Sequence, residues 1–176
     1  MAILRKFRCY RFMERPYTRK SKFRKKAFIK SVPTHNITRF DMGDRTKKFE
    51  FGLELVSKDN VQIRHNAIES ARQIVNRHLH EGLGNNYTFK ITAYPHHILR
   101  ENKMLGGAHA DRLQSGMAHS FGKTVSVAAQ IKKGKSIFLV RCEKKDEAVA
   151  KKALKKSFSR FPCSLSIVPQ DLGRAN

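Results

Sequence analysis

The 24-residue stretch from Arg100 to Lys123 limits the fold most, because it has neither of the patterns that packed elements need. It shows no steady alternation and no helical stripe, and it lies between two strand-like runs at 87–94 and 124–131. It holds four of the ten glycines of the chain: Gly106, Gly107, Gly116 and Gly122. Long connections without structure of their own are uncommon in compact domains and are usually functional or disordered. We interpret 100–123 as a glycine-rich arm that touches a large anionic partner; a plain surface loop is the alternative.

Hydrophobic periodicity predicts the elements before this loop. Residues 48–57 alternate as a half-buried strand does, and 62–81 repeat apolar residues at helical spacing. Asp59 or Asn60 is expected to cap that helix through its side chain. Two glycines follow the helix as stop signals: Gly82 and Gly84. Residues 41–44 are expected to form a turn with self-capping Asp side chains.

The pattern in the second half of the sequence predicts further strands and one more helix. The strand at 87–94 ends before Pro95, and 124–131 and 136–142 are expected to pair as a hairpin across a turn that contains glycine. A helix from an Asp146 cap to about Arg160 and a strand at 164–168 complete the chain. The fold class is therefore α+β, with a mostly antiparallel sheet and two packed amphipathic helices.

The charge of the chain indicates its kind of partner. Thirty-seven Lys and Arg against fourteen Asp and Glu leave a net charge of +23, and such a protein attracts polyanions. The chain contains no run of eighteen apolar residues, so no membrane span is predicted. A binder of acidic membrane surfaces is expected to place its charge beside an apolar helical face, which this chain does not do. Nucleic acid is the expected partner, with no membrane.

The first thirty residues form a basic arm. Twelve Lys and Arg oppose the single acid Glu14, a net charge of +11. Guanidinium groups fork onto phosphates, and interleaved aromatic rings can stack on bases. The arm holds six such rings: Phe7, Tyr10, Phe12, Tyr17, Phe23 and Phe28. We expect an RNA-binding arm at 1–31 and a single domain at 32–176 that carries loop 100–123; a solvated tail is the alternative for the arm.

The chain offers no convincing catalytic or metal-binding set. Its three cysteines, Cys9, Cys142 and Cys163, lack the short spacing of a zinc site or a disulfide framework, so free thiols in a reducing cytosol are expected. His96 and His97 have no acid or thiol at matching distance. We expect no metal, no cofactor and no enzymatic activity.

One near-match to a nucleotide-binding motif fails on its context. Residues 116–124 resemble a phosphate-binding loop, but five residues separate the glycines instead of four, and a strand-like run follows where a helix is required. The acids are dispersed, whereas a two-metal nuclease needs them clustered. A free RNA-binding or RNA-processing enzyme is the alternative function.

The run from Asn102 to Lys123 closely resembles the L-sixteen family of large-subunit ribosomal proteins, in its archaeal and eukaryotic branch, called L-ten-e. Segments 8–11, 16–17, 40–43 and 71–72 agree with that family as well, so the resemblance covers nearly the whole chain. The chain stops soon after its last strand and is therefore similar to archaeal members.

The resemblance implies a non-catalytic protein with a hammerhead-like β element, docked on large-subunit rRNA near the peptidyl-transferase centre and residing in the cytoplasm. Loop 102–123 would reach towards P-site and A-site tRNA, and the other partners would be neighbouring ribosomal proteins and not a second copy of the chain. The implied rRNA-binding residues of the arm are Arg5, Lys6, Arg8, Tyr10, Arg11, Arg15, Tyr17, Arg19, Lys20, Lys22, Arg24, Lys25 and Lys26. The implied tRNA-proximal residues are Lys103, Met104, Gly106, Gly107, His109, Arg112, Gln114, Gly116 and Lys123.

Overall fold

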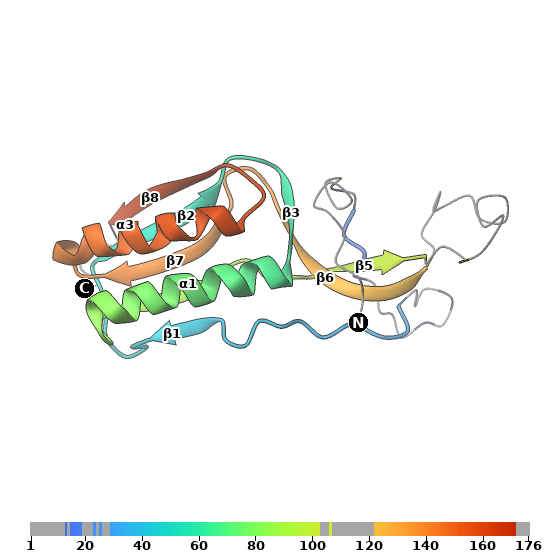
Figure 1. Ribbon diagram of the computed structural model, residues 1–176, viewed down its shortest axis with the longest axis horizontal. Coiled ribbons are helices and arrows are strands. Elements are labelled where there is room, and N and C mark those ends of the chain that lie inside the picture. The colour runs from blue at the N-terminus through green and yellow to red at the C-terminus, as the bar shows by residue number, and fades with distance from the viewer. Residues whose placement is uncertain are drawn as a thin grey trace.

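Two antiparallel sheets share one bent, two-stranded ribbon of chain, and this ribbon organises the fold (Figure 1). Strand β2 (Phe51–Ser57) runs through a short bend into β3 (Val61–Arg64), and β6 (Lys123–Ile131) runs through a second bend into β7 (Ser136–Cys142). β2 pairs with β7 on one side of the bend, and β3 pairs with β6 on the other. The computed structural model describes residues 13, 15–18, 23, 25, 29–102, 106 and 122–171.

The remaining strands extend each half of the ribbon into a sheet. The larger sheet has the order β1-β4-β7-β2-β8, with β1 (Asp41–Gly43), β4 (Thr88–Ile91) and β8 (Leu165–Asp171). The smaller sheet has the order β3-β6-β5, with β5 (His97–Glu101). Pro169 lies in the edge strand β8, where a residue without an N–H group is tolerated.

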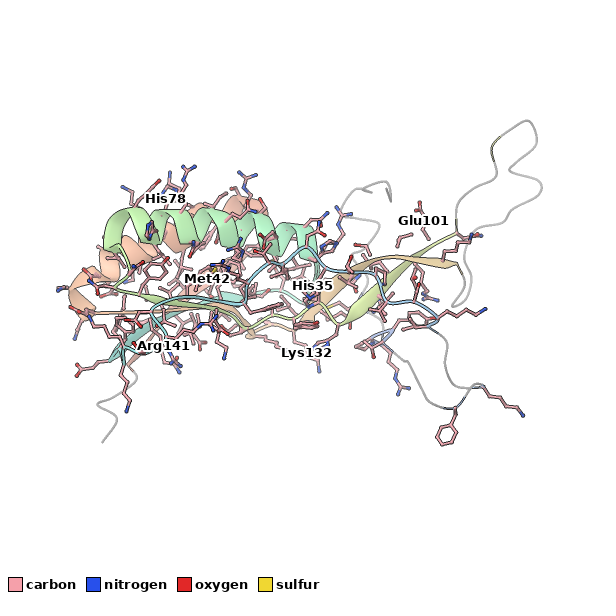
Figure 2. The ribbon with its side chains drawn as sticks, turned by 90° about the horizontal axis from the view of Figure 1, so that it is seen from below. His35, Met42, His78, Glu101, Lys132 and Arg141 are labelled. Carbon is pink, nitrogen blue, oxygen red and sulfur yellow. The ribbon has the colours of Figure 1, made fainter. Side chains whose placement is uncertain are left out.

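Two helices cover one face of the larger sheet: α1 (His65–Leu83) and α3 (Glu147–Lys156) (Figure 2). The short 3₁₀ helices η3 (Lys144–Asp146) and η4 (Phe158–Arg160) flank α3. None of the helices in the described part of the chain is long and apolar enough to cross a membrane.

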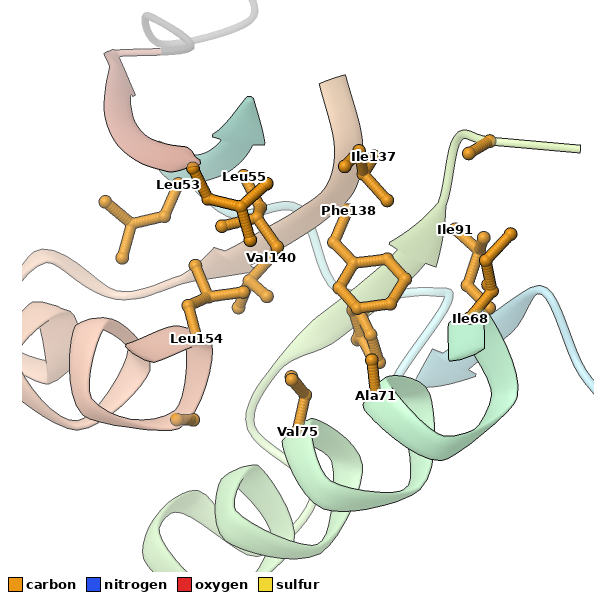
Figure 3. Close-up of a cluster of buried hydrophobic side chains, with 14 of the residues drawn as sticks. Leu53, Leu55, Ile68, Ala71, Val75, Ile91, Ile137, Phe138, Val140 and Leu154 are labelled. Atoms are coloured by element: carbon orange, nitrogen blue, oxygen red, sulfur yellow. The ribbon is translucent and has the colours of Figure 1, made fainter. Parts of the chain in front are cut away.

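The main core lies between this sheet and the helices (Figure 3). Phe89 and Phe138 meet edge to face at its centre, with ring centroids 5.1 Å apart. Leu53 and Leu55 of β2 and Leu154 of α3 are fully buried beside them. Each such side chain stabilises the fold by about 1.5–3 kcal/mol relative to an exposed position. The predicted α+β class, with antiparallel strands and two amphipathic helices, is confirmed.

The predicted hairpin between 124–131 and 136–142 is wrong. β6 and β7 follow each other in sequence, but they belong to different sheets and their described partners are other strands. The turn between them is fastened to the end of β2, because Gly134 N–H donates to Ser57 O (2.8 Å) and Ser57 N–H donates to Lys135 O (3.2 Å). These bonds redirect the chain out of one sheet into the other.

The first helix begins later than predicted, because 61–64 pair with β6 as a strand. Neither Asp59 nor Asn60 caps it. The Asp59 carboxylate accepts a bond from Ser164 N–H (3.0 Å), and the Asn60 side chain accepts one from Lys133 N–H (2.8 Å), so both tie the bend together. Of the two predicted stop signals, Gly84 is confirmed, with a φ of 60° and its N–H donated to His80 O, whereas Gly82 lies inside α1.

Several smaller predictions also need correction. Residues 41–43 form the edge strand β1, and only Asp44 makes the predicted self-capping turn, accepting bonds from the Thr46 backbone and hydroxyl. The strand at 87–94 is shorter, since only 88–91 pair. Asp146 is the N-cap of α3 but makes no side-chain capping bond, and α3 ends at Lys156 instead of continuing to Arg160. The last strand is confirmed and extends to Asp171.

Two glycines with the same backbone conformation give a test of the β1–β4 edge. Gly43 and Gly134 both have a φ of 81°, but a Cβ at Gly43 would collide with the carbonyl oxygen of Tyr87, whereas a Cβ at Gly134 would meet nothing. We expect Gly134→Ala to lower the free energy of unfolding by about 1–2 kcal/mol, the cost of a left-handed conformation. Gly43→Ala is expected to lose that amount and roughly 1–3 kcal/mol more. Urea unfolding measures both, and equal losses would contradict the described contact.

Candidate nucleic-acid interface

The β5–β6 pair carries both ends of the glycine-rich loop away from the helices (Figures 1 and 2). Glu101 lies opposite Lys123 in the register of this pair, and Figure 2 shows Glu101 at the end of the ribbon far from α1. Gly122 has a φ of 104°, and a Cβ there would lie 2.9 Å from the backbone carbonyl of Glu101. The two ends of the loop are therefore held in close backbone contact.

Strand β5 was missed by the sequence analysis, which began the loop at Arg100. Residues 97–101 pair with β6, and Lys123 belongs to β6 as well, where it is exposed. Of the predicted tRNA-proximal residues, only Gly106 and Lys123 are described, and both are exposed. The other seven lie outside the described residues: Lys103, Met104, Gly107, His109, Arg112, Gln114 and Gly116.

Two described residues of the basic arm, Tyr17 and Ile29, pack onto the smaller sheet. Ile29 is 2% exposed and forms a second apolar cluster with Ile98 and Val127, against which Tyr17 packs. Tyr17 N–H donates to Nδ1 of His97 (2.9 Å), and Ile98 N–H donates to Tyr17 O (3.0 Å). The arm is thus fastened to β5 by backbone bonds and apolar contacts.

The aromatic ring of Tyr17 also contacts a cation. The Arg100 guanidinium lies 4.1 Å from the centroid of Tyr17, within the range of cation–π attraction. Arg15 and Lys25, the other described members of the predicted rRNA-binding set, are exposed. The remaining members lie outside the described residues: Arg5, Lys6, Arg8, Tyr10, Arg11, Arg19, Lys20, Lys22, Arg24 and Lys26.

His65 fastens the segment after the arm to strand β6. Its Nδ1 accepts a bond from Asn36 N–H (3.0 Å), so that nitrogen carries no proton. Nε2 is therefore the protonated nitrogen and donates to Ser126 Oγ (3.0 Å). Burial lowers the pKa of His65, and the nearby His35 and Arg64 lower it further.

The acid with the most hydrogen bonds around it, Glu69 on α1, is engaged internally. Arg72 donates to it from two nitrogens (2.7 and 2.8 Å) and Gln73 from one (3.1 Å). Burial opposes the ionisation of Glu69, but these bonds and the charge of Arg72 outweigh it and lower the carboxyl pKa. The third guanidinium nitrogen of Arg72 contacts the sulfur of Met42 on β1 (3.1 Å), so the pair joins the helix to the edge of the sheet.

A second group of charges is paired at the surface. Glu143 accepts bonds from Lys145 (2.7 Å) and Lys47 (2.8 Å), and these bonds lower its pKa to about 2. Glu147 is paired with Lys151. These acids are already matched, and the chain has 37 Lys and Arg against 14 Asp and Glu. This excess of positive charge favours an anionic partner.

The described residues hold neither a metal-binding cluster nor a thiol with a lowered pKa. Among them, no group of three or more His, Cys, Asp or Glu side chains could hold a metal ion. Cys142 and Cys163 are free thiols; burial, with a smaller effect of the acids near it, raises the pKa of Cys142 to about 11. A thiol of that kind is a poor nucleophile. Cys9 lies outside the described residues.

Comparison with known proteins decides the family. The model of "Ribosomal protein L16p/L10e" matches residues 16–168. The chain belongs to this ribosomal protein family. Three archaeal relatives carry the name "Large ribosomal subunit protein uL16": those of Metallosphaera sedula (45% identical), Staphylothermus marinus (42%) and Archaeoglobus fulgidus (41%). The matches cover 94%, 94% and 92% of this chain and 93%, 92% and 90% of the relatives.

Membership confirms the resemblance found in the sequence, including its archaeal type, and it makes the chain a structural component instead of an enzyme. The anchors at His65, His97 and Tyr17 were not foreseen in those roles. The sequence held a partial signal for strand β5, since His97 and Ile98 begin a run with β-forming residues. Their partners lie 29 to 80 residues away along the chain, so no local pattern could have revealed them.

The single-proton state of His65 gives a pH test. Its folded pKa lies below the ordinary value of 6.5, so the unfolded chain binds the proton more readily. Stability is therefore full above about pH 6.5 and is lost as the pH falls through the lowered folded pKa. We expect His65→Gln to lower the free energy of unfolding at pH 7 by about 1–3 kcal/mol, through lost hydrogen bonds, and to flatten the loss on acidification.

The control is His80→Gln, which changes an exposed histidine on the same helix. Urea unfolding at several pH values between about 5 and 8 measures all three proteins. The assignment would be contradicted if the free energy of unfolding fell with pH as steeply in His65→Gln as in the wild type, while His80→Gln changed that pH dependence.

Proposed function

We propose that this protein is a structural constituent of the large ribosomal subunit in the cytoplasm, where it binds large-subunit rRNA near the peptidyl-transferase centre. Its loop 102–123 helps to position P-site and A-site tRNA during translation. The proposal is supported by the family match and by the names of the relatives, which place those proteins in the large subunit. Its other partners are neighbouring ribosomal proteins, and it works neither on a membrane nor as a homo-oligomer.

The observation that carries the proposal is the placement of the loop. Both of its ends sit at the far end of the β5–β6 ribbon, and the base of that ribbon is fastened by Tyr17 and Ile29. A domain with two helices on its sheet would fix the position of the molecule, and the β5–β6 ribbon carries the two ends of the loop away from the helices (Figure 1). This arrangement suits a protein that is held on one RNA and contacts another.

The basic arm supplies affinity without reading sequence. Phosphate contacts position a protein on nucleic acid, and each one makes binding more dependent on salt. Described arm residues such as Arg15 and Lys25 are exposed, while Tyr17 and Ile29 pack inward. One side of the arm thus anchors it and the other presents cations. The division into an arm at 1–31 and a domain at 32–176 remains our proposal.

Shortening the loop tests the tRNA role. We expect replacement of 104–118 by a brief turn to leave the free energy of unfolding nearly unchanged, because residue 101 and residue 123 still pair in the β5–β6 ribbon. On a sucrose gradient the variant should still migrate with the large subunit. Subunit maturation or tRNA accommodation should fall in a strain that carries it. Unchanged translation would speak against the role of the loop, and wild-type protein that never migrates with the subunit would speak against the proposal as a whole.

Neutralising the arm tests the rRNA role. We expect a variant with four arm arginines changed to glutamine to bind transcribed large-subunit rRNA with a salt slope reduced by about 3 log units per decade, at roughly 0.7–0.9 per phosphate contact. The four are Arg5, Arg8, Arg11 and Arg15. Filter binding over a range of salt concentrations measures the slope.

The control removes the same amount of charge from the outside of η3 and α3. Four of the exposed lysines of these two helices are changed to glutamine: Lys144, Lys152, Lys155 and Lys156. We expect this variant to keep the slope of the wild type. Equal losses in both variants would mean that net charge, and not the arm, determines binding.

A further inference from the structure

A cluster of aromatic rings lies at the surface beside the junction of the two sheets, and the proposed function does not involve these rings. Tyr94 stacks on Phe40, with centroids 5.4 Å apart and planes 23° apart. His35 meets Tyr94 edge-on at 5.6 Å, and His96 lies 4.5 Å from it at a tilt of 46°. In spite of these contacts Tyr94 is 44% exposed, and His96 is exposed as well.

The rings are held in place by the backbone that carries them. Thr92 and Ala93 both donate their N–H groups to Ile137 O (3.0 and 3.4 Å), and the Thr92 hydroxyl donates to Ser136 O (2.8 Å). His96 N–H donates to Tyr94 O (3.0 Å), which makes a tight turn between the two rings. The exposed aromatic surface is therefore preorganised and does not have to be assembled when a ligand binds.

A cavity of about 150 Å³ opens beside these rings. Tyr94, His96 and Pro16 contribute to its wall, and Lys135 and Gln130 contribute polar groups. The cavity thus combines flat apolar surface with a cation and an amide. This combination suits a nucleobase, which has an apolar face and a polar edge and is attached to a phosphate.

The surrounding charge also favours a nucleic acid. The turn after β6 presents the exposed lysines Lys132, Lys133 and Lys135, and the facing bend adds Lys58. Figure 2 shows Lys132 and His35 in the same narrow region where the helix-covered sheet gives way to the ribbon. The one acid in these two bends, Asp59, accepts a backbone bond from Ser164 and is not directed at the lysines by any described contact.

We propose that Tyr94 and His96 form a stacking platform for an unpaired nucleobase of RNA, whose backbone phosphate is neutralised by Lys132 and Lys135. Proteins recognise single-stranded RNA by stacking its exposed bases on aromatic and histidine rings. Such stacking tolerates any base, because every base has a π-face. The inference rests on the proposed function, since it names a site through which the protein holds RNA.

The test uses the full chain and two RNA probes of equal length and charge: an oligoadenylate and an abasic ribose-phosphate oligomer. Tyr94→Leu keeps an apolar side chain against Phe40 but removes the ring. We expect it to lose on the order of 10-fold in affinity for oligoadenylate and to bind the abasic oligomer as the wild type does. Tyr94→Phe, which keeps the ring, should bind both probes like the wild type. Lys132→Gln with Lys135→Gln should weaken binding of both probes.

A second variant reports on contact directly and does not depend on how well Tyr94→Leu folds. The chain contains no tryptophan, so Tyr94→Trp introduces a single tryptophan fluorophore at the platform. We expect oligoadenylate to quench its emission and the abasic oligomer to leave it unchanged. Equal quenching by both probes, or equal affinity of wild type and Tyr94→Leu for oligoadenylate, would overturn the platform.

The two proposals fail in different ways. Wild-type protein that neither binds large-subunit rRNA nor migrates with the large subunit removes the proposed function and the platform with it. Wild-type protein that migrates with the subunit, with Tyr94→Leu and Tyr94→Trp behaving as though no base were in contact, removes only the platform. Loss of subunit association in Tyr94→Leu with unchanged affinity for both probes would assign the surface to a protein neighbour and also overturn the inference.

Discussion

The pairing of one bent ribbon against another is the constraint on which the rest of the molecule depends. β2 and β3 run antiparallel to β7 and β6, and both chains leave one sheet and enter the other at the same place. Backbone bonds between Ser57 and the turn at 132–135 hold the two bends in register. A slip of one residue there would turn the buried side chains of both sheets outward, because side chains alternate across a strand. The core under the helices and the ribbon that carries the loop thus share one register.

That shared register explains how a small domain can hold the two ends of a long loop far from its core. The larger sheet has two helices to bury it. Among the described residues, Ile29 and Tyr17 of the arm pack on the part of the smaller sheet formed by β5 and β6, and His65 fastens the segment around Asn36 to β6. Packing of the arm therefore stabilises the ribbon, and the ribbon holds the ends of the loop together at Glu101 and Lys123. In the proposed function, the segment that binds rRNA and the loop that meets tRNA are coupled through a few side chains on β5.

The charged side chains also fall into two groups: acids that are paired within the fold, and cations that are exposed. Glu69 is paired with Arg72 within α1, and Glu143 is paired with Lys145 beside it and with Lys47, which lies 96 residues away along the chain. The described cations of the arm, Arg15, Lys25 and Lys30, are exposed, as are the lysines of the turn at 132–135. A chain with a net charge of +23 repels itself when it folds, and a polyanion relieves that repulsion. Folding stability and RNA binding are expected to depend on each other for this reason.

The sequence by itself determined the composition of the layers, the α+β class, the positions of two helices and most strands, the glycine stop at Gly84 and the family. Local periodicity carries that information, because a strand or a helix buries one face wherever it lies. It could not assign β6 and β7 to different sheets, detect β5, or place Tyr17 on His97 and Asn36 on His65. Those features arise from contacts between residues tens of positions apart. Asp59 and Asn60 show the reason most clearly: both are good helix caps by type, but only the tertiary structure decided that they tie down a bend.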